Sequence, residues 1–198
     1  MGIKHCGKST LSKSLAKYYN CPFFDTDDLI TELTQKTPRQ IFTEQGQQGF
    51  AAAEAESCKT LSEKLAENSV ISTGSAIIAT GGGICNNEQA LSFLRSINCL
   101  FVFLQVPETL AADRIVAEAV FEKDSSNQES RISNLPAYIA KKNPHSQQDV
   151  RNIFHDFYVE RTDCYKTIAD LCVTVNSSNI EENTANIVNL VNNFLKSN

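Results

Sequence analysis

Eight residues near the amino terminus have the types and the spacing that bind the phosphates of a nucleotide. Residues 2–9 read glycine, four residues, then Gly-Lys-Ser. In such a phosphate-binding loop, backbone N–H groups and a lysine ammonium surround the phosphates, and the hydroxyl is a ligand candidate for Mg²⁺. Leu11 and Leu15 follow at helical spacing, so a helix begins where its positive end meets the phosphates. The pattern predicts a nucleotide site, with a chance Gly-Lys turn as the alternative.

Two carboxylates follow a short apolar run. Asp25 and Asp27 come directly after residues 21–24, which are typical of a buried strand. Catalytic groups in open parallel sheets gather at the carboxyl ends of strands. One carboxylate can hold Mg²⁺ through water, and the other can accept a hydroxyl proton or a hydrogen bond. Capping of a helix by Asp27 is the structural alternative, and both roles can hold together.

Three glycines follow a second apolar run, Ala76–Ala79. Gly81, Gly82 and Gly83 expose backbone N–H groups and let a ligand approach closely. A plain tight turn has the same composition. The glycines are therefore a second candidate contact for a ligand.

Helix and strand signals alternate along the chain, which favours a parallel sheet covered on both faces. We expect helices over residues 9–19, 29–33, 38–65, 88–97, 107–121, 149–169 and 180–194. We expect strands over residues 21–24, 70–72, 76–79, 100–104 and 172–175. Residues 123–148 are polar and broken by prolines, as in a disordered linker or a lid over a site. We predict one domain, 1–198, in which 123–148 is the lid.

Composition argues against several classes of protein. A net charge of −5 argues against a nucleic-acid partner, which usually selects a basic surface. The sequence shows neither a secretory leader nor an apolar run of bilayer length, so we expect a cytoplasmic protein without a membrane partner. Seven scattered cysteines without Cys-x-x-Cys spacing signal neither a zinc site nor a redox dithiol.

Six motifs stand in order across nearly the whole chain. They are the loop at 2–9, Phe23–Asp27, Ile41–Gly46, Phe50–Glu54, Ala79–Gly83 and Glu160–Tyr165. Together they resemble the shikimate kinases. The resemblance implies an α/β fold, a three-layer α/β/α P-loop kinase whose parallel sheet has strand order 2-3-1-4-5. It implies transfer of the ATP γ-phosphoryl group to the 3-hydroxyl of shikimate, on the route to chorismate and the aromatic amino acids. It also implies ATP and Mg²⁺ as cofactors and a small-molecule substrate. We expect a monomer.

The resemblance assigns the nucleotide side of the site. Residues that line the ATP phosphates would be His5, Cys6, Gly7, Lys8, Ser9 and Thr10. Lys8 would be catalytic, because its ammonium stabilises charge during transfer. Ser9 would ligate Mg²⁺ directly, and Asp25 would support the ion.

The resemblance also assigns the substrate side. Asp27 would bind the substrate hydroxyls and orient or deprotonate the attacking one, as the second catalytic residue. Gly82 and Gly83 would offer backbone contacts to the substrate. Arg161 would pair with the substrate carboxylate, and a surface ion pair with Glu160 or Asp163 is its alternative.

Two positions lack an arginine that the family has, and His5 stands where the family's phosphate-binding loop usually has its middle glycine. Ala51 stands where the family has an arginine that clamps the shikimate carboxylate, and Leu135 stands where the lid has an arginine, unless Arg131 takes that place. Losing a bidentate carboxylate contact in a desolvated site costs about 2–5 kcal/mol. Two alternatives therefore stay open: a kinase for another small hydroxylated substrate, or a non-catalytic nucleotide-binding relative.

Only Met1 precedes the phosphate-binding loop. In the family, a strand at the centre of the sheet leads into this loop. We therefore expect a sheet that lacks its first strand. Our hypothesis is that the sequence begins at an internal methionine of a longer natural protein.

Overall fold

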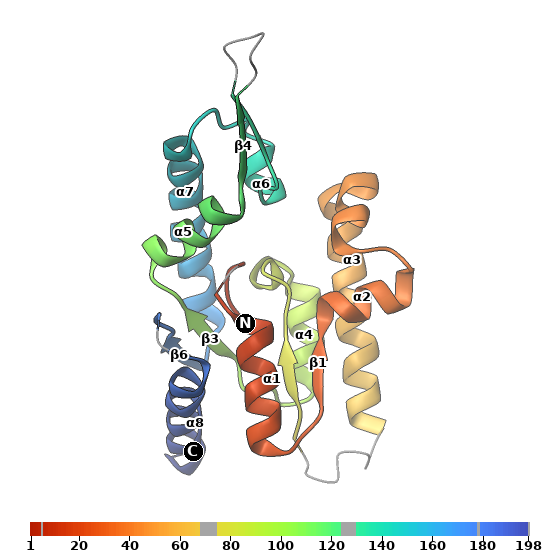
Figure 1. The fold of residues 1–198 in the computed structure, drawn as a ribbon. Helices are drawn as coiled ribbons and strands as arrows, with labels where there is room; N and C mark the ends of the chain where they lie inside the picture. The colour runs from red at the N-terminus through yellow and green to blue at the C-terminus, as the bar shows by residue number, and fades with distance from the viewer. Residues whose placement is uncertain (5, 68–74, 124–129, 178, 198) are drawn as a thin grey trace.

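The computed structural model describes residues 1–4, 6–67, 75–123, 130–177 and 179–197 (Figure 1). Its helices are α1 (Lys8–Tyr19), α2 (Thr26–Thr34), α3 (Pro38–Glu67), α4 (Glu88–Ser96), α5 (Glu108–Glu118), α6 (Ala137–Ala140), α7 (Gln147–Ile168) and α8 (Ile180–Ser197), with a 3₁₀ turn η1 (Ile84–Asn86). Its strands are β1 (Phe23–Asp25), β2 (Ile77–Ala79), β3 (Val102–Gln105), β4 (Val120–Lys123), β5 (Ser130–Ser133) and β6 (Leu171–Thr174).

Two separate pairs of parallel strands form the centre of the molecule. β1 pairs with β2 in the register Phe23↔Ile77 to Asp25↔Ala79, and β3 pairs with β6. β4 and β5 form an antiparallel pair that stands apart from these strands (Figure 1). Within the described ranges, no strand joins β2 to β3. This arrangement agrees with the expected parallel fold and with a gap at the place of its first strand.

Helices cover the strands on both faces. α1 packs on β1 and β2 and also against α8, which contacts β6. α7 contacts β3 and packs against α5 and α6. α3 packs against both α2 and α4. Figure 1 shows α1 beside β1 and β2, and α8 next to β6. The three-layer architecture follows from these contacts.

One continuous hydrophobic core joins the strands to the helices and to the amino-terminal loop. The rings of Phe103 and Tyr165 are stacked with their centroids 5.0 Å apart, and both side chains are fully buried. The Tyr165 hydroxyl donates a hydrogen bond to the Gly2 carbonyl oxygen at 3.2 Å. A buried phenol needs such a partner, so this contact ties the beginning of the loop to α7.

The predicted helix over residues 107–121 was wrong at its end. The helix ends at Glu118, Ala119 has an extended backbone (φ −71°, ψ 140°), and β4 begins at Val120. Val120 and Phe121 pair with residues of β5, so distant pairing takes these residues out of the helix. The predicted strand over 70–72 lies outside the described residues.

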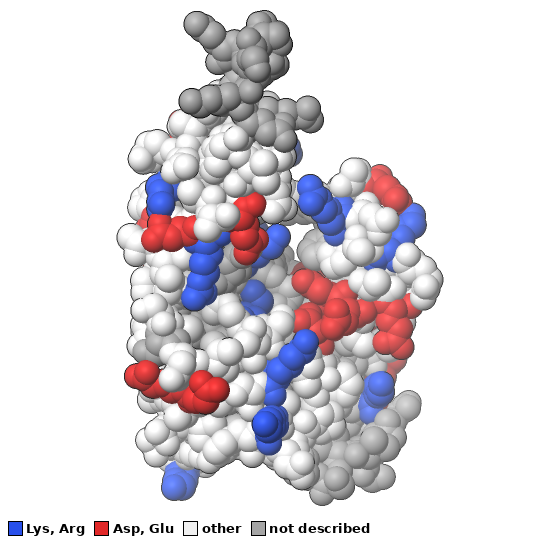
Figure 2. Space-filling model, in the orientation of Figure 1, with Lys and Arg blue, Asp and Glu red and all other residues white. Residues whose placement is uncertain are grey.

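The surface carries both signs of charge. Figure 2 shows acidic side chains gathered beside α2 and β1, and side chains of both signs of charge on the other side of a hollow. Among the described residues, no helix combines the length and the apolar composition that a bilayer crossing requires.

Candidate active site

The phosphate-binding loop and the aspartate pair meet at the carboxyl end of β1. The Ser9 hydroxyl donates a hydrogen bond to Oδ2 of Asp25, with 2.9 Å between the two oxygens. Burial and the neighbouring charge of Asp25 raise the pKa of Asp27, while the nearby Lys8 ammonium opposes that rise. The two predicted parts of the site therefore lie within electrostatic reach of each other.

The loop presents its backbone and the first turn of α1 to a ligand. Gly7 precedes α1 with φ 86°, a left-handed conformation that disfavours a side chain. Ser9 and Thr10 are exposed, whereas the Cys6 side chain is completely buried. Cys6 can therefore meet a phosphate through its backbone, and its thiol belongs to the core. His5 lies outside the described residues.

A backbone carbonyl group of the loop fixes the position of the Lys8 side chain. Its ammonium donates a hydrogen bond to the Ile3 carbonyl oxygen at 2.8 Å. This bond places the cation between the beginning of the loop and the first turn of α1. A phosphate in the loop would find the ammonium already positioned.

Asp25 has two structural partners, one for each carboxylate oxygen. Oδ2 accepts the Ser9 hydroxyl, and Oδ1 accepts the backbone N–H of Asp27 at 3.0 Å. Asp25 is extended (φ −118°, ψ 124°) and caps the amino end of α2. The alternative that Asp27 caps this helix was wrong, because Asp25 occupies the capping position. The Asp27 side chain is left to act in the site.

Gly81 allows two buried carboxylates to approach the glycine run. A Cβ on Gly81 would lie 2.7 Å from Oε1 of Glu54 and 3.1 Å from Oδ1 of Asp27. The Gly81 N–H donates to the Thr26 hydroxyl at 2.9 Å, which holds the run against the amino end of α2. Any larger residue at position 81 would displace the carboxylates.

Glu54 and Asp27 each have one carboxylate oxygen without a hydrogen-bond partner in the described part of the chain. Oε1 of Glu54 and Oδ1 of Asp27 are buried and have no hydrogen-bond partner among the described residues. The other oxygen of Glu54 accepts from the Asn87 amide at 2.9 Å. Burial raises the Glu54 pKa to about 7, helped by the Asp27 charge and opposed by the Asn87 hydrogen bond. Two unpartnered acceptors side by side favour a ligand that brings hydroxyl donors.

Arg161 reaches the glycine run from α7. Its Nη1 donates to the Gly83 carbonyl oxygen at 3.4 Å and lies 3.4 Å from the Cys85 sulfur. Its guanidinium stands 5.1 Å from the centroid of the Phe157 ring. The buried Nε has no partner, and Arg161 takes part in none of the ion pairs found among the described residues. Arg161 therefore faces the site, which disfavours the surface ion-pair alternative.

Ala51 and Leu135, which stand where the family has arginines, lie in different surroundings. Ala51 is half-buried on α3, and its carbonyl oxygen accepts from the Asn87 amide at 2.9 Å. Leu135 is 5% exposed and belongs to the hydrophobic core. The Arg131 side chain lies outside the described part of the chain.

Sequence reasoning assigned no role to Glu54, Asn87 or Thr26. Glu54 stood inside a quoted motif, and its place among apolar residues of a helix was the available signal. Asn87 has the pattern of a helix cap, which it also is, because its side chain accepts from the N–H of Ala90. Its second function, holding Glu54, depends on a contact between two helices.

A glycine-rich loop at the beginning of a helix, parallel strands and an adjacent aspartate pair define an α/β P-loop kinase fold. The family model for shikimate kinase matches residues 4–192. This chain belongs to the shikimate kinase family.

Individual relatives agree with this assignment. A shikimate kinase of Clostridium botulinum is 30% identical over 192 residues, which cover 96% of this chain and 94% of the relative. A shikimate kinase of Aquifex aeolicus is 37% identical over 114 residues, 58% of this chain and 62% of the relative. The crystal structure of shikimate kinase from Aquifex aeolicus has a TM-score of 0.65 at 29% identity, covering 97% of this chain and 94% of that one. A shikimate kinase from Acinetobacter baumannii, solved in complex with shikimate, has a TM-score of 0.70 at 22% identity, covering 97% and 90%, and supports the fold.

Proposed function

We propose that this kinase transfers the γ-phosphoryl group of ATP to the 3-hydroxyl of shikimate. The observation that carries the proposal is the hydrogen bond between Ser9 and Asp25, which brings the phosphate-binding loop to the aspartate pair. Membership of the shikimate kinase family supports the choice of substrate. Phosphoryl transfer requires alignment and charge stabilisation, and this edge of the strands supplies groups for both.

The nucleotide phosphates would lie over residues 5–10. Backbone N–H groups of the loop and the amino end of α1 would bind phosphate oxygens. Lys8, positioned by its bond to Ile3, would stabilise the charge that develops on the transferred group.

The residues at the end of β1 suit Mg²⁺. The Ser9 hydroxyl and the Asp25 carboxylate supply oxygen donors 2.9 Å apart. The described residues contain no group of three or more His, Cys, Asp or Glu side chains that could hold a metal alone. This fits Mg²⁺ in kinases, which takes one or two protein ligands together with phosphates and waters. When bound, the ion would neutralise negative charge on the phosphates.

The substrate would lie between Asp27 and Arg161. Asp27 would accept the hydrogen bond of the attacking hydroxyl, and its raised pKa makes it a better base than an exposed aspartate. Backbone groups of Gly82 and Gly83 would contact the substrate. Arg161, which already contacts Gly83, would pair with the carboxylate.

A second candidate function is phosphorylation of a related hydroxylated substrate. Ala51 and Leu135 both lack a cation, and the Leu135 side chain is buried in the core. A site with fewer cations holds a carboxylate less strongly, so a polyol substrate competes better. A monomeric state and a cytoplasmic location remain predictions from the sequence.

A substrate panel tests the proposal. ADP release with shikimate, quinate and simple polyols is followed in a coupled assay with Mg-ATP, for the unaltered chain and for Lys8→Met. We expect the largest kcat/KM with shikimate and loss of turnover in Lys8→Met. Preference for a polyol would select the second function, and ATP binding without turnover of any substrate would contradict both.

A further inference from the structure

The guanidinium of Arg161 lies against η1, the short turn that follows the glycine run. With its oxygen toward Arg161, the Asn86 amide accepts from Nη1 at 2.9 Å and from Nη2 at 3.2 Å. A guanidinium only donates hydrogen bonds, so its N–H groups require this orientation of the amide. The other amide atom is then the nitrogen, which lies 3.2 Å from the Cys164 sulfur and 3.7 Å from the Cys85 sulfur. A thiol sulfur is a weak acceptor, so both sides of the amide have suitable neighbours.

Asn86 occupies one end of the guanidinium and leaves one side of it open. The N–H groups of a guanidinium form two forks, Nη1 with Nη2 and Nε with Nη2. The Asn86 oxygen occupies the first fork, and the Gly83 carbonyl oxygen accepts from Nη1 at 3.4 Å. Nε is buried and has no partner among the described residues. The second fork, formed by Nε and the remaining N–H of Nη2, is therefore the one that can take a carboxylate.

The backbone of the turn fixes Asn86 relative to α7. The Asn86 N–H donates to the Gly83 carbonyl oxygen at 3.0 Å, the same oxygen that Arg161 contacts. The Cys164 thiol of α7 donates to the Cys85 carbonyl oxygen at 3.1 Å. Cys85 is buried, whereas Asn86 itself is exposed. Packing of the core therefore does not explain an asparagine at position 86, but the contact with Arg161 does.

An asparagine suits this place because its oxygen carries no net charge. A carboxylate would also hold the guanidinium, but it would neutralise the cation that a substrate carboxylate must meet. Arg161 takes part in none of the ion pairs found in the described ranges. Ala51 and Leu135 add no second cation. The charge of Arg161 is therefore left for the substrate.

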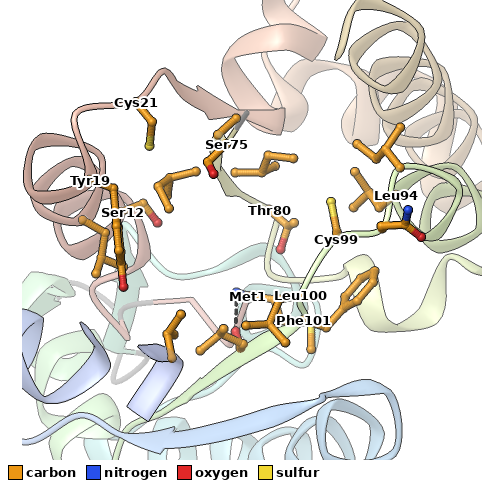
Figure 3. A pocket seen from close by; sticks show the side chains of 18 of the residues that line it. Met1, Ser12, Tyr19, Cys21, Ser75, Thr80, Leu94, Cys99, Leu100 and Phe101 are labelled. Carbon is orange, nitrogen blue, oxygen red and sulfur yellow. Dashed lines mark hydrogen bonds between the residues drawn. The ribbon is translucent and has the colours of Figure 1, made fainter. Parts of the chain in front are cut away.

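The apolar cavity between the two pairs of parallel strands is a separate place (Figure 3). Its volume is about 440 Å³, and Leu94, Leu100 and Phe101 are part of its wall. Neither Asn86 nor Arg161 is among the described residues that line it. A substitution of Asn86 therefore leaves the wall of this cavity unchanged.

We propose that Asn86 is a positioning residue for substrate binding: its amide oxygen holds the Nη1–Nη2 end of Arg161 and directs the Nε–Nη2 side toward the substrate carboxylate. The inference rests on the proposed function and adds a residue that acts through Arg161. Because Asn86 holds the guanidinium before the substrate arrives, less side-chain freedom is lost on binding. The benefit therefore falls on affinity for the carboxylate and not on the transfer step.

The first measurement does not involve the substrate. In ¹⁵N NMR of the Arg161 side chain, assigned with Arg161→Lys, rotation about the Cζ–Nη bonds is followed in the unaltered chain and in Asn86→Leu. Leucine has a similar size and no acceptor, so we expect this rotation to become at least about fivefold faster. Asn152→Leu is the matched control and leaves the rotation unchanged, because Asn152 is exposed on α7 and its side-chain oxygen accepts from Gln148.

Steady-state kinetics separate substrate binding from transfer. In Asn86→Leu, we expect the shikimate KM to rise about tenfold, while kcat and the ATP KM change less than about twofold. Asn86→Asp keeps an acceptor, so the Nη rotation stays slow, but the new carboxylate competes with that of the substrate. We therefore expect the shikimate KM of Asn86→Asp to rise at least as much as that of Asn86→Leu.

Equal Nη rotation in the unaltered chain and in Asn86→Leu would overturn the proposal. So would a shikimate KM of Asn86→Leu within about twofold of the unaltered value. Losses of kcat and Tm that accompany the rise in KM would show a structural role and would also overturn it. A chain that binds Mg-ATP but turns over no shikimate would contradict the proposed function, and the Nη rotation alone would then decide about Asn86.

Discussion

The Ser9 hydroxyl and the Asp25 carboxylate are joined by a hydrogen bond of 2.9 Å. This bond links the first turn of α1 to the end of β1. The second oxygen of Asp25 caps α2 through the N–H of Asp27. One carboxylate therefore fixes the phosphate-binding loop relative to the residue that we propose as the base.

Replacing Asp27 by asparagine tests the proposed base. Asp27→Asn keeps the size of the side chain but cannot take a proton, so we expect kcat to fall about 10²–10⁴-fold. Steady-state kinetics with shikimate and ATP measure the change. Asp28→Asn, exposed on the same helix, is the matched control and retains activity. Equal losses in both variants would show that position 27 has no special role.

Replacing Arg161 tests the carboxylate contact. In Arg161→Met, we expect the shikimate KM to rise at least about 30-fold, because a desolvated ion pair is lost, with little change in the ATP KM. Arg151→Met is the control on the same helix, since Arg151 pairs with Asp113 at the surface. A rise confined to the ATP KM would move Arg161 to the nucleotide side.

Adding an arginine at position 51 tests the pocket from the other side. Ala51→Arg brings a cation beside the Asn87 and Glu54 contacts, so we expect the shikimate KM to fall about tenfold. Ala52→Arg adds the same charge at an exposed neighbouring position and leaves KM unchanged. If the two variants behave alike, the effect comes from general charge, and the predicted pocket is misplaced.

Alanine substitutions at Gly81 and Gly83 form a matched pair that tests how tightly the glycine run is packed. In Gly81→Ala, the new Cβ would lie 2.7 Å from Glu54, and we expect Tm to fall by about 3–10 °C through overpacking. In Gly83→Ala, the Cβ meets nothing within 4 Å, so Tm stays within about 1 °C. Thermal unfolding followed by circular dichroism measures both. A larger loss at position 83 than at position 81 would contradict the close packing of Gly81 against Glu54.

Glu54 makes stability depend on pH. Its pKa rises from 4.5 to about 7 on folding, so the folded protein binds more protons than the unfolded chain in this interval. Its contribution to the unfolding free energy therefore falls as pH rises from about 4.5 to about 7, by roughly 1–3 kcal/mol. In Glu54→Gln, this fall disappears.

Urea unfolding of both proteins across this pH range measures the difference. The comparison with Glu54→Gln is needed because the Met1 amine acts oppositely: its pKa falls from 8.0 to about 5, so its contribution rises with pH between those values. Parallel stability curves for the two proteins would show that Glu54 does not titrate in this range.

Local patterns predicted the elements that carry the site. The spacing of the phosphate-binding loop is set by backbone geometry within a few residues, and the periodicity of α1, α4, α7 and α8 placed them within a few residues. The end of α5 was wrong because Val120 and Phe121 are drawn into a strand by pairing with residues about ten positions away.

The composition of the site was harder to predict than its location. The capping role of Asp25 depends on backbone torsions that Asp-x-Asp does not reveal. Glu54 and Asn87, which are 33 positions apart in the sequence, form a hydrogen bond between α3 and the beginning of α4. The resemblance to a family assigned Arg161 and Gly83 to the substrate separately, and their direct contact across 78 residues was not predicted.

The most direct measurement follows phosphorus from donor to acceptor. The chain is incubated with Mg-ATP and shikimate, and the products are identified by ³¹P NMR. We predict shikimate 3-phosphate in amounts equal to ADP, and neither product with Lys8→Met. Release of ADP with inorganic phosphate alone, or bound ATP that is never consumed, would contradict phosphoryl transfer at this site.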